Sequence, residues 1–169
     1  YIKTQIHEGV TEKELALKIE FFIKNNQCDT AFTPIVAFNE NSAIPHYLSS
    51  KKCNLKSNSL ILMDFGAKYE NYCADMTRVL FYNNPSPDRI KTYMTVLNAQ
   101  KIGLENIKPG VHGQLIDKSV KNYITSRDYP PYFHGLGHGV GIDIHEKPKL
   151  KTGNMDMLDI NMVFTVEPG

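Results

Sequence analysis

Two aspartates near the middle of the sequence, Asp64 and Asp75, could act together on one ligand. In a single straight strand they would lie about 36 Å apart, too far to share a site. A hairpin turn at Glu70-Asn71 instead places Asp75 opposite Gly66 and makes Asp64 its diagonal neighbour on the same face, with about 7–8 Å between Cα atoms. Two such carboxylates could converge on divalent cations, for which Gly66 would leave room. The alternative is a pair of solvent-exposed strand aspartates.

A second candidate is the glycine-rich segment 134–148, which holds three of the six histidines. Glycine stands at every second position from Gly135 to Gly141, and it permits close backbone approach and unusual dihedral angles around the imidazoles. The segment does not match a phosphate-binding loop, because no Lys-Ser or Lys-Thr pair and no helix follow it. Three imidazoles within twelve residues indicate chemistry rather than isolated surface histidines. They are His134, His138 and His145.

Two shorter segments could add polar groups. Glu167 ends the apolar run 163–166, where it is either a solvent-exposed charge or a carboxylate at the edge of a buried pocket. His46 lies between Pro45 and Tyr47, shortly after a turn cluster at 39–42. A serine nucleophile has little support, because no Gly-x-Ser-x-Gly motif occurs.

The surrounding pattern predicts the elements that position these residues. Thr11 and Glu14 form a capping box that starts a helix ending near residue 25, and further helices are predicted over about 87–107 and 115–123. Strands are predicted over 32–38, 60–65, 69–82 and 162–166. We find no internal repeat. This order, with a hairpin at its centre, predicts an α+β domain built on an antiparallel sheet.

Composition excludes several classes of protein. The 169 residues are 41% hydrophobic and carry a net charge of +1, which argues against a disordered chain and against a nucleic-acid partner. No apolar run is long enough to cross a membrane, and three cysteines give no disulfide framework. We therefore expect a cytoplasmic protein with a single domain over 1–169. The lack of an initiator Met before Tyr1 indicates a fragment.

Four motifs together resemble the metallopeptidase family with the pita-bread fold, which includes methionine aminopeptidases and the Xaa-Pro aminopeptidases and dipeptidases. The matching segments are 35–47, 63–78, 134–148 and 165–169, and they span nearly the whole chain. Asn41-Ser42-Ala43, Pro45-His46-Tyr47 and the run 134–146 resemble the Xaa-Pro branch more than the methionine branch. The resemblance implies the pita-bread fold, an antiparallel sheet flanked by helices, here incomplete at both ends.

The resemblance also implies a site for two adjacent divalent ions. Asp64 would chelate one ion, Asp75 would bridge both, and His138 and Glu167 would bind the other. Three carboxylates and one imidazole suit Mn²⁺ best, with Co²⁺ or Zn²⁺ as alternatives. The family has a fifth ligand, a glutamate on a strand that would follow Gly169. We therefore expect the piece 1–169 alone to be weakly active or inactive.

The remaining polar residues receive catalytic roles from the same resemblance. His46, His134 and His145 would hold substrate and stabilise charge during proton transfer, and Glu167 would double as general base. The implied reaction removes the N-terminal residue from a small peptide with proline at its second position, as an aminopeptidase or a dipeptidase. A homodimer is left open.

Three alternatives remain on the same fold: a methionine aminopeptidase, a catalytically inactive protein-binding module and, ranked last, a metal-independent hydrolase of a small amidine. Fold alone does not choose between them. The ligand set argues against the binding module and the metal-independent hydrolase, because every ligand position that the chain covers is Asp, His or Glu. This set favours an enzyme.

Overall fold

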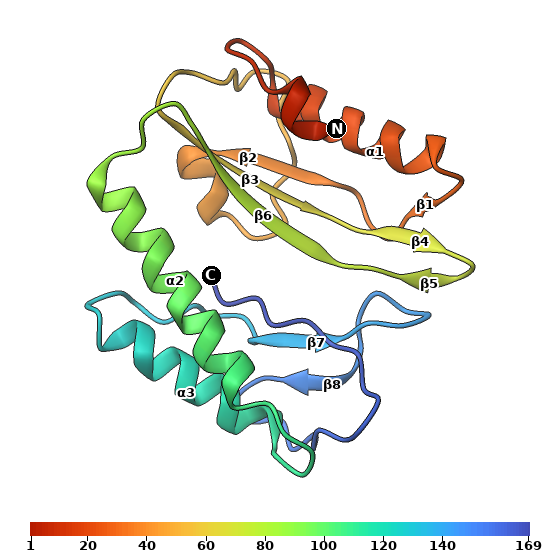
Figure 1. The fold of residues 1–169 in the computed structure, drawn as a ribbon, viewed down its shortest axis with the longest axis vertical. Helices are drawn as coiled ribbons and strands as arrows, with labels where there is room; N and C mark the ends of the chain where they lie inside the picture. Colours follow the sequence, from red (N-terminus) through yellow and green to blue (C-terminus); the bar gives the residue numbers. More distant parts are fainter. The chain divides into compact units, whose positions relative to one another are not determined.

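Residues 1–169 are all described by a computed structural model, and they divide into two units, Tyr1–Arg89 and Ile90–Gly169 (Figure 1). Each unit has its own hydrophobic core. The single domain over 1–169 that the sequence predicts stays a prediction. No helix of the chain combines the length and apolar composition needed to cross a bilayer.

The first unit is built around α1 (Glu12–Asn25), which follows a short 3-10 helix, η1 (Ile2–Gln5). The predicted capping box is confirmed, since the Thr11 hydroxyl accepts from the Glu14 backbone N–H and the Glu14 carboxylate accepts from the Thr11 backbone N–H. Leu15, Ile19 and Ile23 recur at helical spacing and are buried. They bring α1 against one face of a three-stranded sheet (Figure 1).

That sheet has the antiparallel order β2-β3-β6, formed by Ile35–Phe38, Ser59–Phe65 and Met76–Tyr82. A smaller sheet has the order β1-β4-β5, from Asp29–Thr30, Ala67–Tyr69 and Tyr72–Cys73. A second 3-10 helix, η2 (Asn39–Ala43), follows β2. The strand predicted over 69–82 therefore contains the last residue of β4, the turn at 70–71 and the two strands β5 and β6, which are separated by a break at 74–75.

The predicted hairpin register is confirmed. Glu70 and Asn71 form the turn, and both have positive φ, 46° and 71°. Tyr69 pairs with Tyr72, and farther along the hairpin Asp64 pairs with Thr77. The register is thus the same on both sides of the break, which keeps Asp75 opposite Gly66 and Asp64 diagonal to Asp75.

Gly66 has a different role from the one expected. A Cβ atom at this position would lie 1.9 Å from the carbonyl oxygen of Ala74 and 2.9 Å from the ring of Phe32. The missing side chain therefore accommodates the backbone of the facing strand and does not leave open space beside the carboxylates. The prediction of room at Gly66 was wrong for this steric reason.

The second unit packs two helices, α2 (Pro87–Glu105) and α3 (Gly113–Thr125), with an antiparallel pair, β7 (Gly137–Gly139) and β8 (Glu146–Leu150). Helix α2 begins at the boundary between the units. The core of the second unit consists of buried residues from both helices, from β8 and from the loops around the strands. They are Ala99, Ile116, Val120, Ile124, Tyr132, Leu136, Leu150 and Leu158.

The predicted strand over 162–166 is not formed. A single bridge joins Phe164 to Gly139. The segment still runs antiparallel to β7, because the Thr165 N–H donates to the His138 carbonyl at 2.8 Å and the Glu167 N–H donates to the Leu136 carbonyl at 2.8 Å. These bonds fix Glu167 beside the glycine-rich segment.

The turns that precede the core helices α1 and α3 have the same backbone arrangement, which the sequence did not predict. Gly9 has φ +86° and donates to the Leu55 carbonyl at 2.9 Å, and Gly110 has φ +84° and donates to the Leu158 carbonyl at 2.8 Å. In both cases valine follows the glycine. The two units thus share a local backbone arrangement at these turns.

Candidate metal centre

The first unit contributes two carboxylates. Asp64 is near the end of β3, between its partners Ile35 on β2 and Thr77 on β6. Asp75 immediately precedes β6 and is opposite Gly66 in the hairpin register. The register places both aspartates on one face of the hairpin as diagonal neighbours, about 7–8 Å apart between Cα atoms.

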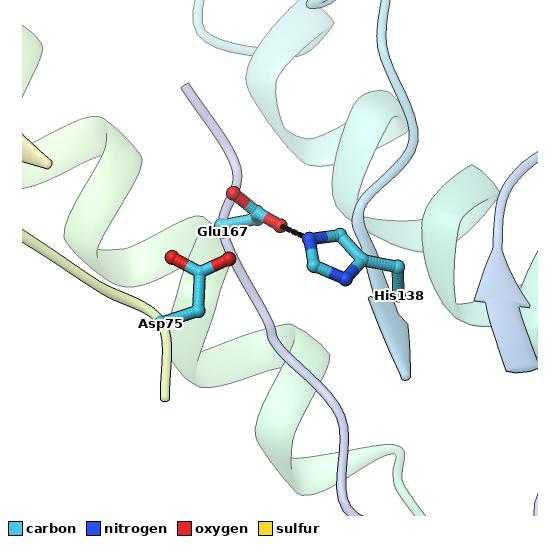
Figure 2. A group of neighbouring side chains, drawn as sticks. All are labelled: Asp75, His138 and Glu167. Carbon is cyan, nitrogen blue, oxygen red and sulfur yellow. Dashed lines mark ion pairs between the residues drawn. The ribbon is translucent and has the colours of Figure 1, made fainter. Parts of the chain in front are cut away.

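The second unit contributes an imidazole and a carboxylate in direct contact. Nε2 of His138, on β7, lies 3.2 Å from Oε1 of Glu167. Figure 2 shows the ring and the carboxylate pointing toward one another. The other ring nitrogen, Nδ1, lies 3.0 Å from the carbonyl oxygen of Gly139. A carbonyl can only accept, so Nδ1 carries the proton.

This arrangement suits a cation. In a neutral ring with its proton on Nδ1, Nε2 presents a lone pair, and here it faces an oxygen of Glu167 that is also an acceptor. A proton or a metal ion between the two atoms turns a repulsive contact into an attractive one. Histidine ligands of metals commonly donate their second N–H to a carbonyl in this way. The His138–Glu167 pair therefore fits a divalent metal with nitrogen and oxygen ligands.

Thr165 fixes the pair, and the sequence analysis assigned it no role. Its Oγ1 donates to Oε1 of Glu167 at 2.7 Å and accepts from the His138 backbone N–H at 3.0 Å. Burial raises the pKa of Glu167, but the contact with His138 and the hydrogen bond from Thr165 outweigh it and leave that pKa below its ordinary value. Glu167 is therefore an ionised acceptor at neutral pH. The sequence signal for this role is the spacing of the two residues. Thr165 and Glu167 are two positions apart in an extended segment and so lie on the same side of it.

The other two histidines of the segment differ in their surroundings. The exposed ring of His145 meets the ring of His138 edge-on, with 4.3 Å between centroids. The ring of His134 lies 4.9 Å from that of Tyr132, and its Nδ1 donates to the Gly135 carbonyl at 2.7 Å. This leaves Nε2 of His134 as the nitrogen that can exchange protons with a ligand.

The glycines of this segment serve close backbone approach. A Cβ atom on Gly137 would lie 2.0 Å from the Thr165 carbonyl oxygen, and one on Gly139 would lie 2.1 Å from that of Lys147. None of the segment's four glycines is among the glycines with positive φ, which are Gly9, Gly110 and Gly153. The spacing of the glycines thus packs β7 between its neighbours.

His46 is on an exposed part of the first unit, in the segment that follows η2. It has φ +52°, in the left-handed region that non-glycine residues adopt infrequently. Two residues of this segment, Tyr47 and Ser50, donate hydrogen bonds to Glu12, a residue for which the sequence indicated no function.

The profile of metallopeptidase family M24 matches residues 1–169. The chain belongs to this family. The M24 assignment agrees with the family named from the motifs, and it supports the use of divalent metal ions.

Named relatives of this M24 chain act on proline peptides. The Xaa-Pro dipeptidase of Pyrococcus horikoshii is 38% identical over 167 residues, which cover 98% of this chain and 47% of the relative. The structure of the X-Pro aminopeptidase from Thermotoga maritima superposes with a TM-score of 0.94 at 40% identity, covering 99% of this chain and 48% of that one. The chain spans about half the length of the curated relatives it matches.

The α+β pita-bread fold predicted from the sequence is confirmed by these likenesses. The methionine aminopeptidase of Rickettsia prowazekii has a TM-score of 0.87 at 21% identity, which shows the shared fold alone. The predicted ligands are divided between the units of this M24 chain, Asp64 and Asp75 in the first and His138 and Glu167 in the second. Their assembly into one centre stays a prediction.

Proposed function

We propose that the protein is a metal-dependent exopeptidase that removes the N-terminal residue from peptides with proline at the second position. Membership of family M24 supports the reaction class. The names of the similar proteins, an Xaa-Pro dipeptidase and an X-Pro aminopeptidase, support the substrate class. The odd number of cysteines, without a disulfide framework, supports a cytoplasmic location.

The proposed centre holds two divalent ions, Mn²⁺ in preference to Co²⁺ or Zn²⁺. Asp64, Asp75, His138 and Glu167 would hold these ions. Hard carboxylate oxygens dominate this set, and the one nitrogen ligand is compatible with Mn²⁺. When bound, the ions lower the pKa of a water molecule and polarise the scissile carbonyl group.

The side chains of the protein perform the proton transfers. Glu167 accepts a proton from the attacking water through the oxygen that Thr165 does not occupy, while the water oxygen bonds to the scissile carbonyl carbon. Glu167 then gives this proton to the nitrogen that leaves as the C–N bond breaks. His134 and His145 donate hydrogen bonds to the charge that develops on the substrate. His46 holds the peptide in place. Each of these roles needs a positioned donor or acceptor. A group positioned for proton transfer typically accelerates a reaction about 10²- to 10⁴-fold.

The observation that carries the proposal is the contact of His138 Nε2 with Glu167 Oε1 at 3.2 Å, with the Nδ1 proton committed to the Gly139 carbonyl. Two such groups, held together by backbone pairing and by Thr165, are suited to sharing a proton or a metal ion, and this supports the proposed metal centre. A module that only bound other proteins would have no need of this arrangement.

The test is an assay of the full-length protein with Mn²⁺ on Xaa-Pro dipeptides and tripeptides, with matched peptides carrying alanine in place of proline. We expect cleavage of the proline peptides, no activity after chelation, and recovery on adding Mn²⁺. Cleavage of methionyl-alanyl peptides alone would indicate a methionine aminopeptidase. A protein that neither binds metal nor cleaves any peptide would contradict the proposal and favour a binding module.

A further inference from the structure

Glu12 is a completely buried carboxylate in the first unit. Its Oε1 accepts hydrogen bonds from the Phe38 backbone N–H at 2.7 Å and from the Asn41 side-chain amide at 2.9 Å. Its Oε2 accepts from the Tyr47 hydroxyl at 2.8 Å and from the Ser50 backbone N–H at 3.1 Å. Four donors satisfy both oxygens, as expected of an ionised carboxylate held away from water.

All four donors belong to one stretch of chain, 38–50. Its second half, 44–50, forms neither helix nor strand, so no ladder of backbone hydrogen bonds fixes it. His46 is in this half, next to Tyr47, and has φ +52°. Burial, together with the bond to Glu12, raises the pKa of Tyr47 to about 12, so its hydroxyl remains a donor at neutral pH. Glu12 thus fixes the segment on both sides of His46.

We propose that Glu12 is a positioning residue that holds His46 in the conformation needed to bind the peptide. This inference rests on the proposed function, because the role of His46 in substrate binding is part of it. A neutral amide at position 12 would turn an NH₂ group toward two of the four donors. Buried donors left without an acceptor destabilise the local structure, and the segment would then sample other conformations.

Helix α1 does not need Glu12 for its own start. The capping box that begins the helix uses Thr11 and Glu14. Glu20, on the same helix, makes an exposed ion pair with Lys24 at 2.6 Å. A Glu20→Gln change therefore has the same chemistry on the same helix without the buried network, and it serves as a matched control.

The second unit contains a comparable anchor. Asp117 on α3 is completely buried and accepts from the Tyr132 hydroxyl at 3.0 Å and from Lys121 Nζ at 3.0 Å. The same Lys121 Nζ donates to the His134 carbonyl oxygen at 3.0 Å. In both units, hydrogen bonds thus connect a buried acid on the core helix to the segment that carries a histidine with a proposed role in substrate binding, His46 in the first unit and His134 in the second.

The first experiment measures the anchor without relying on activity. Amide hydrogen exchange is followed in the full-length protein and in its Glu12→Gln, Tyr47→Phe and Glu20→Gln variants. We expect exchange over 41–50 to quicken about tenfold or more in Glu12→Gln and by less in Tyr47→Phe, while the core strand β3 keeps its protection. Glu20→Gln should match the wild type. Unchanged exchange over 41–50 in both Glu12→Gln and Tyr47→Phe would overturn the proposal.

The second experiment asks whether Glu12 acts through His46. On an Xaa-Pro peptide, Glu12→Gln should lower kcat/KM about 10- to 100-fold with metal content unchanged, mainly through a higher KM. In a His46→Ala background the same change should cost less than about threefold, because coupled residues are not additive. Fully additive losses would overturn the link to His46. An inactive wild type would refute the proposed function instead, and hydrogen exchange would still decide whether Glu12 anchors the segment.

Discussion

Nε2 of His138 and Oε1 of Glu167 lie 3.2 Å apart, and the opposite nitrogen of the ring donates to the Gly139 carbonyl. The extended pairing of β7 with residues 162–167 sets this spacing through backbone hydrogen bonds. Backbone pairing and Thr165 thus set the distance between the two candidate ligand atoms. The residues around the ligands can therefore be tested separately from the ligands themselves.

Mutations at His134 and His145 should differ from a mutation at a metal ligand in their effect on metal content. In the full-length protein, His134→Ala or His145→Ala should lower turnover about 10²- to 10⁴-fold, because a positioned proton-transfer or charge-stabilising group is lost. Metal content should stay intact in both. Asp75→Ala should lose the metal itself. Elemental analysis beside rates on an Xaa-Pro peptide measures the difference. If His134→Ala loses metal as Asp75→Ala does, the roles assigned to these residues are wrong.

Thr165→Val should weaken metal binding while the fold is retained. Valine has nearly the same shape but cannot donate to Oε1 of Glu167, a bond of 2.7 Å. Loss of a hydrogen bond that orients a ligand commonly costs about 10- to 100-fold in metal affinity or activity. Titration of the apo protein with Mn²⁺ measures the change, and Thr165→Ser is the control that keeps the hydroxyl. Equal affinity of the valine and serine variants would count against this role.

Gly66→Ala should destabilise the first unit by about 2 kcal/mol or more, as overpacking does when the opposing atoms cannot move aside. The new Cβ would meet the Ala74 carbonyl oxygen at 1.9 Å. Gly103→Ala is the comparison, because its Cβ would meet side-chain methyl carbons at 3.1 Å and 3.3 Å, which can shift. Urea unfolding of both variants gives the free energies. A Gly66→Ala variant as stable as Gly103→Ala would refute the steric explanation.

Asp117 should make the stability of the second unit depend on pH. Burial raises its pKa, but hydrogen bonds from Thr152 and Lys121 outweigh burial and leave the pKa below its ordinary value. A lowered folded-state pKa gives stability that is present above the unfolded-state value, about 3.9, and is lost as the pH falls through the folded-state value. Asp117→Asn should therefore cost about 3 kcal/mol at pH 7, and this cost should shrink below about pH 4.

Urea unfolding of the wild type and Asp117→Asn at pH 7, 5 and 3 measures this difference. Asp128→Asn provides a control for removal of an aspartate charge at an exposed position. A difference between Asp117→Asn and the wild type that is the same at all three pH values would show that the charge of Asp117 does not contribute.

Local rules predicted the elements with strong sequence signals. The capping box at Thr11 and the turn at Glu70-Asn71 depend on residues within three positions of each other, and both are formed as expected. Because strand pairing propagates from the turn, the relation of Asp64 to Asp75 also followed from the sequence.

Features that depend on distant partners could not be predicted in this way. Glu12 looked like an ordinary first-turn residue, and its donors come from a segment that begins 26 residues later. The segment 162–166 has the composition of a strand, but it makes only one bridge with β7. Gly66 is required by the carbonyl of Ala74, which lies on the facing side of the hairpin.

The most direct test of the proposed centre is anomalous X-ray diffraction from crystals of the full-length protein loaded with Mn²⁺. Two anomalous peaks should lie within about 2.0–2.4 Å of ligand atoms from Asp64, Asp75, His138 and Glu167, with carboxylates from the first unit and the His138–Glu167 pair from the second on the same pair of ions. Peaks bound by residues of one unit only, or located away from these four side chains, would contradict the account.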